Sequence, residues 1–134
     1  QELKLELLEN EANSLVEQAT LWNEYKLVKN VFSDKTMSEL QQMAKHIIQH
    51  NENVITILLN EKDEKFQLVM ARSNNGDINM QEVMKKILPA INGKGGGNKN
   101  IAQGGGDATL SSEVLFERIL QAFTGDDLTG YTLS

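Results

Sequence analysis

The sequence predicts a single α/β (α+β) domain with a long helix in front of it. Apolar residues recur at helical spacing over the first 23 positions, whereas residues 54–59 and 66–71 are continuous apolar runs of strand length. The chain has 134 residues, 40% of them hydrophobic, which suits one folded domain. We expect the order helix, strand, helix, hairpin, helix, glycine-rich loop, helix.

The first helix is predicted over residues 1–24. Its apolar seam follows alternating steps of three and four residues, at Leu5, Leu8, Ala12, Leu15, Ala19 and Trp22. This seam is about two and a half heptads long, which is less than a coiled coil needs. Leu3, Leu7 and Val16 widen it and favour burial against a larger surface. We expect the helix to dock on its own domain or to connect to an upstream one. Pairing with a second copy is the alternative.

The globular domain is predicted over residues 25–124. Residues 25–32 are rich in β-branched and aromatic side chains, which is typical of a strand. Thr36 and Glu39 have the spacing of a capping box, so a helix is predicted over 37–50. The two apolar runs that follow are separated by a polar segment and predict a hairpin of buried strands.

Two more helices are predicted after the hairpin. Asn79 can cap a helix over residues 80–91, which Pro89 should kink or end because proline lacks the N–H that a helix interior needs. Ser111 or Ser112 can cap a last amphipathic helix, and Gly125 suits its C-terminal end. Residues 125–134 are expected to form a short polar tail.

Residues 93–106, called the glycine-rich segment below, hold seven of the ten glycines and two Gly-Gly-Gly runs. Because glycine accepts positive φ and lets another molecule approach the backbone closely, we expect a shaped binding loop here. The segment lacks the Gly-Lys-Ser/Thr ending of a P-loop, and it follows a helix rather than the first strand of a βαβ unit. Its free N–H groups favour a nest for phosphate or another anion. A flexible, hairpin-like connection is the alternative.

The distribution of charge also indicates the glycine-rich segment as the place where a phosphate would bind. Between residues 83 and 106 there are four lysines, Lys85, Lys86, Lys94 and Lys99, and no acidic residue, although the net charge of the chain is −6. The acidic total argues against indiscriminate binding of nucleic acid, which depends on neutralising phosphates. Any affinity for phosphate is therefore expected near the glycine-rich segment.

The remaining composition excludes several kinds of chemistry. The absence of cysteine excludes disulfides, thiolate metal sites and cysteine nucleophiles. His46 and His50 have the i, i+4 spacing at which two imidazoles can share a metal, but two ligands do not make a zinc site. We expect these to be solvated histidines. No serine, histidine or carboxylate pattern indicates a catalytic centre, so none is predicted.

The glycine-rich segment resembles a known signature. Its string Gly-Lys-Gly-Gly-Gly-Asn-Lys-Asn-Ile-Ala-Gln-Gly-Gly-Gly is similar to Gly-Gly-Gly-Arg-Pro-x-x-Ala-Gln-x-Gly-Gly in the DHH-associated C-terminal domain of alanyl-tRNA synthetases and AlaX-type alanyl-tRNA editing proteins. The resemblance covers residues 1–124 and implies a small mixed β-sheet covered by helices. Ala102-Gln103 matches the Ala-Gln pair in the signature of the alanyl-tRNA branch of this family. Asn98 stands where the phosphodiesterase branch usually carries histidine, and Asn98-Lys99 replaces Arg-Pro.

The resemblance implies a non-catalytic domain that supports tRNA binding or dimerisation in an alanyl-tRNA editing hydrolase or an alanine-tRNA ligase. Zinc is expected only in a separate, upstream editing domain, with no cofactor on this chain. Binding of alanine-type tRNA by the isolated chain is expected to be weak and salt-sensitive. The implied contacts to nucleic acid or phosphate are Lys94, Gly95, Gly96, Gly97, Asn98, Lys99, Gln103, Gly104 and Gly105.

Two alternatives remain. One is the substrate-binding domain of a DHH-type phosphodiesterase that acts on oligonucleotides or cyclic dinucleotides, and the other is a structural module whose first helix pairs two subunits as a homodimer.

The first residue is Gln1 rather than methionine, which favours a piece of a longer polypeptide. No apolar run is long enough to span a bilayer, and the lack of cysteine fits a reducing compartment. We therefore expect a cytoplasmic protein without a membrane partner.

Overall fold

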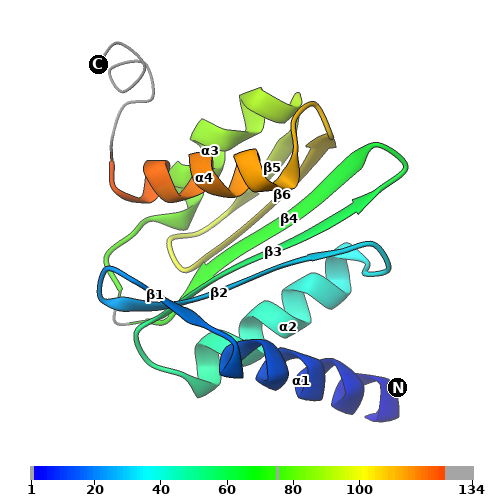
Figure 1. Cartoon of the computed structure of the whole chain (residues 1–134), viewed down its shortest axis with the longest axis vertical. Helices are drawn as coiled ribbons and strands as arrows, with labels where there is room; N and C mark the ends of the chain where they lie inside the picture. Colours follow the sequence, from blue (N-terminus) through cyan, green and yellow to red (C-terminus); the bar gives the residue numbers. More distant parts are fainter. Residues whose placement is uncertain (1, 75, 126–134) are drawn as a thin grey trace.

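A computed structural model describes residues 2–74 and 76–125 of the chain, in which strands and helices form three layers (Figure 1). The strands are β1 (Thr20–Trp22), β2 (Tyr25–Phe32), β3 (Val54–Lys62), β4 (Lys65–Arg72), β5 (Lys94–Gly97) and β6 (Ile101–Asp107). The helices are α1 (Glu2–Glu17), α2 (Met37–His50), α3 (Met80–Ile87) and α4 (Ser112–Phe123), with a 3-10 helix η1 at Leu88–Ile91. The α+β class and the long N-terminal helix are confirmed.

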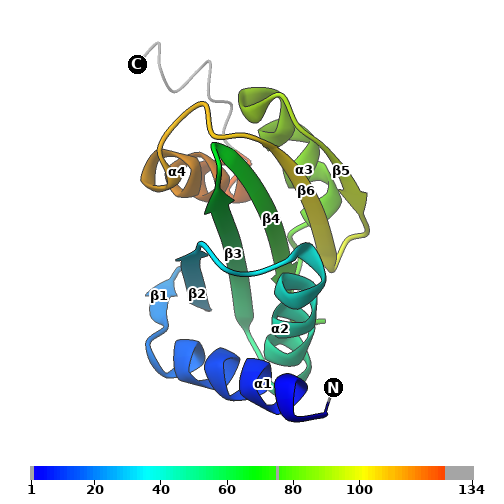
Figure 2. The same cartoon turned by 90° about the vertical axis from the view of Figure 1, so that its right-hand side faces the viewer.

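The strands form one mixed sheet in the order β1-β2-β3-β4-β6-β5. Among the strands that the structure describes, only β2 and β3 pair in parallel, and α2 makes the crossover between them. Figure 2 shows α1 and α2 on one side of this sheet and α3 and α4 on the other. Each side has its own core. One is centred on Leu40, Met43 and Ile47 of α2, and the other on Met84, Ile87 and Ile119 of the α3–α4 layer.

The first helix is shorter than the sequence predicts. It ends at Glu17, and Thr20–Trp22 instead pairs antiparallel with β2. The turn between the two strands contains Asn23 at φ 54°, a left-handed conformation that a helix cannot include. Helix α1 packs on α2 through the buried Leu8 and Ala12.

The predicted start of α2 is confirmed. Thr36 Oγ1 accepts a hydrogen bond from the Glu39 N–H at 3.1 Å, and Glu39 Oε1 accepts one from the Thr36 N–H at 2.9 Å. Together they form the capping box, which satisfies two N–H groups at the helix terminus. The Thr36 N–H, and then Lys4 of α1, lower the pKa of the Glu39 carboxyl.

The hairpin of β3 and β4 is longer than its apolar runs. Its register continues to Lys62 opposite Lys65. The two turn residues, Asp63 and Glu64, both have positive φ, at 53° and 63°. Such a two-residue turn matches the twist of the paired strands. The hairpin therefore extends to the polar residues that the sequence analysis assigns to a connection.

The later helices begin and end near their predicted positions. Asn79 Oδ1 accepts a hydrogen bond from the Glu82 N–H at 3.2 Å, and α3 gives way to η1, which contains Pro89. Ser111 rather than Ser112 caps α4, through the Val114 N–H at 3.2 Å. From residue 126 onward the predicted tail lies outside the described residues. No helix among the described residues is long and apolar enough to cross a bilayer.

Candidate functional site

The glycine-rich segment is a β-hairpin, so the predicted loop is wrong. Strands β5 and β6 pair antiparallel, with Gly95 opposite Gly104 and Gly96 opposite Gln103. Strand β6 also pairs with β4 along its whole length, and β5 forms the edge of the sheet. The predicted alternative, a hairpin-like connection, is the nearer description. Glycine has low strand propensity, but β4 supplies the hydrogen-bonding partner that holds β6 extended.

Asn98 forms the turn of this hairpin. Its Oδ1 accepts hydrogen bonds from the N–H groups of Asn100 at 2.8 Å and Ile101 at 3.1 Å. Two further hydrogen bonds connect the turn to the start of α3 and to the segment before it. The Lys99 carbonyl accepts from the N–H of Met80, and the Asn100 side-chain amide donates to Asn74 Oδ1. The residue that replaces arginine or histidine of the related signatures is thus a turn former.

Three of the predicted site glycines are required by backbone and helix packing. A Cβ on Gly104 would lie 2.7 Å from Leu88 Cδ2 and 3.0 Å from Met84 Sδ, on the side of α3 and η1. A Cβ on Gly95 would lie 2.1 Å from the Gln103 carbonyl oxygen. Gly97 has φ 146°, where side chains are rarely accepted. These three glycines allow close approach within the molecule itself.

The other side of the hairpin is uncovered. A Cβ on Gly96 would have no atom within 4 Å, and one on Gly105 would meet only the Phe66 carbonyl oxygen, at 3.1 Å. Because cross-strand partners share a side of the sheet, Gly96 and Gln103 lie on the same side as Gly105 and Lys94. Gln67 of β4, opposite Gly105, continues this row. We call these five residues the open sheet face.

Helix α2 lies on the same side of the sheet but packs over β3 and β4. The side chains of Gln103 and Lys94 are consequently exposed, and Gln67 is half-buried. The open sheet face therefore combines nearly bare backbone with two amides and a lysine. Such a surface can donate and accept hydrogen bonds and attract an anion, and it contains no nucleophile or acid-base pair.

The four predicted lysines are not brought together. Lys85 and Lys86 lie on α3, on the far side of the sheet, and Lys85 Nζ is 3.8 Å from Glu82 Oε2. Lys94 and Lys99 lie on the β5–β6 hairpin and are exposed. Sequence analysis misses Lys65, whose Nζ is 2.5 Å from Asp107 Oδ1 at the end of β6.

This ion pair affects both of its members. Its hydrogen bond raises the pKa of Lys65 and, together with one from Asn92, lowers the pKa of Asp107. Both groups therefore remain charged over a wide range of pH. Only the antiparallel register of β4 with β6 places them side by side, because they are 42 residues apart in the sequence.

The two histidines are stacked, with ring centroids 4.2 Å apart. His46 is half-buried between α1 and α2, which corrects the prediction that both are solvated. Its Nε2 is 2.9 Å from Asn13 Oδ1, and its Nδ1 is 3.7 Å from Glu9 Oε2. Burial, and then the neighbouring His50, lower the pKa of His46. The described residues contain no group of three or more side chains suited to hold a metal.

The fold and the glycine hairpin define a member of one domain family. Residues 23–125 match the family model described as the DHHA1 domain. The chain belongs to this family, and the resemblance inferred from the glycine-rich segment is confirmed.

The named relatives of the chain include an alanyl-tRNA editing protein and alanine–tRNA ligases. The chain is 27% identical over 121 residues to alanyl-tRNA editing protein AlaX-L of Pyrococcus horikoshii, covering 90% of this chain and 28% of that protein. It is 31% identical over 96 residues to alanine–tRNA ligase of Buchnera aphidicola, covering 70% of this chain and 11% of that protein. The chain thus spans less than a third of either relative.

Solved structures share the fold. The C-Ala domain of Aquifex aeolicus alanyl-tRNA synthetase superposes with a TM-score of 0.73 at 23% identity, covering 80% of this chain and 98% of that one. RecJ from Thermus thermophilus superposes with a TM-score of 0.65 at 17% identity, covering 93% of this chain and 19% of that one. At these identities the likeness concerns architecture alone.

Proposed function

We propose that this chain is a non-catalytic, tRNA-contacting domain of an alanyl-tRNA synthetase-related protein. The observation that carries the proposal is the open sheet face, where Gly96 and Gly105 leave the backbone uncovered beside Gln103 and Lys94. The relatives with named functions act on alanyl-tRNA or charge tRNA with alanine, which supports RNA as the ligand.

The chemistry of this face suits the backbone and shape of RNA. Lys94, and Lys99 at the turn, can neutralise phosphates, and the Gln103 amide can donate to or accept from a ribose 2′-hydroxyl. The uncovered glycines let the sugar-phosphate chain approach the sheet closely. With two lysines at the hairpin and a net charge of −6, binding is weak and salt-sensitive.

Hydrolysis of mischarged tRNA belongs to another part of the parent protein in this proposal. The chain has two histidines and no cysteine, so its side chains do not fit the histidine and cysteine zinc ligands of the related editing domains. The contribution of this chain is to hold tRNA for the parent's editing hydrolase or ligase activity.

Fold alone also relates the chain to RecJ and to a pGpG-specific phosphodiesterase of Vibrio cholerae, the latter with a TM-score of 0.54 at 12% identity. A phosphodiesterase substrate domain is therefore the second candidate. It ranks lower because Asn98, at the position of that branch's histidine, has its side-chain oxygen engaged in the hairpin turn. A preference for short oligonucleotides over tRNA would favour it.

Dimerisation through α1 is a separate element of the proposal. Leu3 and Leu7 are 71% and 61% exposed on that helix, although Leu8 beside them is buried against α2. Sedimentation of the wild type and of a Leu3→Lys, Leu7→Lys variant tests it. A homodimer predicts that the variant sediments as a monomer, and a monomeric wild type would contradict dimerisation.

Fluorescence anisotropy with alanine-type tRNA tests the RNA interface. The Lys94→Ala, Lys99→Ala variant is compared with Lys85→Ala, Lys86→Ala, which removes the same charge from the far side of the sheet. The first is expected to lower the slope of log K against log salt by about 0.9 for each lost phosphate contact. An unchanged slope, or an equal loss in both variants, would contradict the proposed interface.

A further inference from the structure

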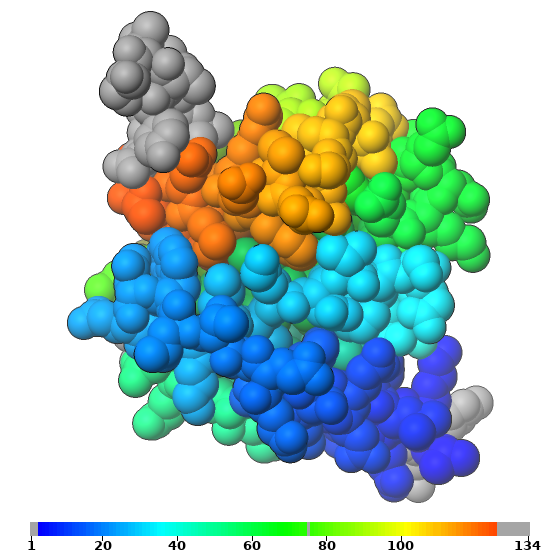
Figure 3. Space-filling view, in the orientation of Figure 1, coloured from blue at the N-terminus to red at the C-terminus, as the bar shows by residue number. Residues whose placement is uncertain are grey.

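A cleft of about 530 Å³ borders the open sheet face. It lies between the end of the β3–β4 hairpin and the segment 33–36 that leads into α2. In the space-filling view, these two parts of the chain, green and cyan, lie near one another at one side of the molecule (Figure 3). The volume is within the range of small-ligand sites, which is about 300–1,000 Å³.

Two amides form the floor of this cleft. Asn60 of β3 and Gln67 of β4 are cross-strand partners, so their side chains lie on the same side of the sheet. Asn60 is 5% exposed, and its Oδ1 accepts a hydrogen bond from the Lys35 N–H at 2.8 Å. The Asn60 Nδ2 forms no hydrogen bond with any described residue, and neither does the Gln67 side chain. No buried side-chain nitrogen or oxygen among the described residues lacks a hydrogen-bond partner, so the unpartnered Asn60 Nδ2 is accessible from the cleft and can donate to a ligand acceptor there.

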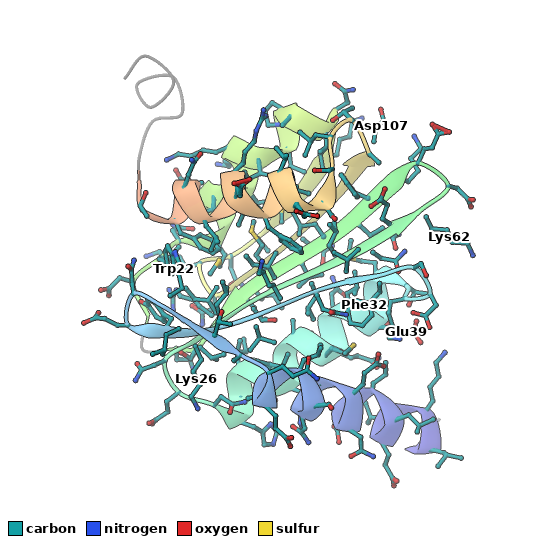
Figure 4. All side chains as sticks on the ribbon, viewed as in Figure 1. Trp22, Lys26, Phe32, Glu39, Lys62 and Asp107 are labelled. Carbon is teal, nitrogen blue, oxygen red and sulfur yellow. The ribbon has the colours of Figure 1, made fainter. Side chains whose placement is uncertain are left out.

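The rim of the cleft carries a lysine without an ion pair among the described residues. Lys62 lies opposite Lys65 at the end of the hairpin, and Figure 4 shows Lys62 near the start of α2, marked by Glu39. Lys65 is held by Asp107, whereas Lys62 is exposed and available. Two carboxylates also border the cleft. Asp34 shares the Lys35 ammonium with Glu11, each at 3.2 Å, and Asp63 lies in the hairpin turn next to Lys62. Lys62 is therefore the cation of this rim that is left for a phosphate, beside the Asp63 carboxylate.

The geometry points to one unpaired RNA nucleotide as the ligand of this cleft. We propose that Asn60 and Gln67 hydrogen-bond the edge of its base and that Lys62 contacts its phosphate. Side-chain amides present the donor and acceptor pattern that base edges require, and unpaired bases are the ones that proteins read in RNA. This inference rests on the proposed function, because Gln67 belongs to both the cleft and the open sheet face. RNA that crosses Gly105 reaches Gln67 on the next strand.

Mononucleotides test the inference directly. The 134-residue chain is titrated separately with the four ribonucleoside 5′-monophosphates and with ribose 5-phosphate, and the side-chain NH₂ signals of Asn60 and Gln67 are followed by two-dimensional NMR. At least one mononucleotide is expected to shift both signals, and ribose 5-phosphate is not. Shifts of equal size with ribose 5-phosphate would overturn base recognition. No shift at millimolar nucleotide would overturn the site.

Matched variants assign the contacts. Gln67→Ala is expected to weaken mononucleotide binding about fivefold, the effect of one lost hydrogen bond, whereas Gln49→Ala on exposed α2 surface is expected to leave it unchanged. Lys62→Ala is compared with Lys26→Ala, whose lysine lies at the opposite end of the sheet (Figure 4). Equal effects of Gln67→Ala and Gln49→Ala, or of the two lysine variants, would contradict the assignment.

The same titration separates this inference from the proposed function. In the Lys94→Ala, Lys99→Ala variant, the mononucleotide shifts at Asn60 and Gln67 are expected to persist. If the wild-type chain binds no tRNA but mononucleotides still shift these two amides, the cleft stands and the proposed tRNA interface falls. If tRNA binds through the hairpin lysines and no mononucleotide shifts the two amides, the cleft falls and the interface stands.

Discussion

Gly96 and Gln103 lie directly opposite each other across β5 and β6, on a side of the hairpin that none of the described helices covers. The neighbouring pair, Gly95 and Gly104, faces the opposite way, where Leu88 and Met84 pack against it. One short hairpin thus has a packed side and an open side. The requirement for glycine has a different cause on each side.

Substitution by alanine is expected to separate the two causes. Gly104→Ala places a methyl 2.7 Å from Leu88 Cδ2 and is expected to lower the free energy of unfolding by about 1–3 kcal/mol. Gly96→Ala meets no atom within 4 Å, and its φ lies outside the left-handed region, so it is expected to be neutral or stabilising by up to about 1 kcal/mol. Urea denaturation measures both. Equal destabilisation would contradict the packing argument.

Gly96→Ala is also expected to weaken tRNA binding. Its methyl would stand on the open sheet face and keep the sugar-phosphate chain away from the backbone. Anisotropy titrations of the variant and the wild type at the same low salt concentration measure the change. Because the fold is expected to be unaffected, an unchanged affinity would argue that RNA does not approach the sheet at this position.

Asn98→Ala is expected to destabilise the hairpin. It removes the oxygen that accepts from the N–H groups of Asn100 and Ile101, and the expected loss is about 1–2 kcal/mol. Asn98→Asp keeps an acceptor oxygen and serves as the control. Thermal or urea denaturation distinguishes them. Identical stability of the alanine variant and the wild type would show that the turn does not depend on this side chain.

The stability of the α1–α2 contact is expected to depend on the protonation of His46. Burial, and then His50, hold the pKa of His46 below its ordinary value, so the folded state favours the neutral ring. This contribution to stability is present above the unfolded-state pKa, near 6.5, and is lost as pH falls through the lower folded-state pKa. Urea midpoints measured from pH 7.5 to about pH 5 should therefore decrease.

His46→Gln is expected to remove most of this decrease. His50→Gln is the matched control, because the His50 ring is exposed and the variant leaves His46 buried, so most of the pH dependence should remain. A His46→Gln variant with the wild-type pH profile would assign the effect to another group.

Loss of the α2 cap is expected to cost about 1 kcal/mol. Thr36→Ala removes the hydroxyl that accepts from the Glu39 N–H, whereas Thr36→Ser keeps it. Comparison of the three proteins by urea denaturation isolates the cap from the packing of the threonine methyl. Serine should restore most of the stability that alanine loses. Equal losses in both variants would contradict the cap.

The parts of the fold that local chemistry determines can be predicted from the sequence. The boundaries of α2, α3 and α4 follow from caps at Thr36, Asn79 and Ser111, whose hydrogen bonds connect residues three apart. Strands β3 and β4 follow from apolar runs. Strand β1 is missed because Ala19 and Trp22 continue the helical period, and only its pairing with β2 makes it a strand.

The candidate site is predicted less well because its geometry depends on distant partners. The glycine-rich segment has no side-chain alternation that could indicate a strand, and the extended form of β6 comes from pairing with β4, whose paired residues lie about 30 to 42 positions earlier. Lys85 and Lys94 are close in sequence but lie on different sides of the sheet. Composition identifies the segment, whereas only the register shows which of its glycines face outward.

The turn at Asn98 to Asn100 has a consequence for insertions and deletions. Strand β6 is held in register by β4, so adding or removing one residue in the turn would shift β5 alone by one position. Since side chains alternate along a strand, Lys94 would then point toward α3 and η1. The number of residues in this turn therefore determines which side of the molecule presents the positive charge, independently of the glycine content of either strand.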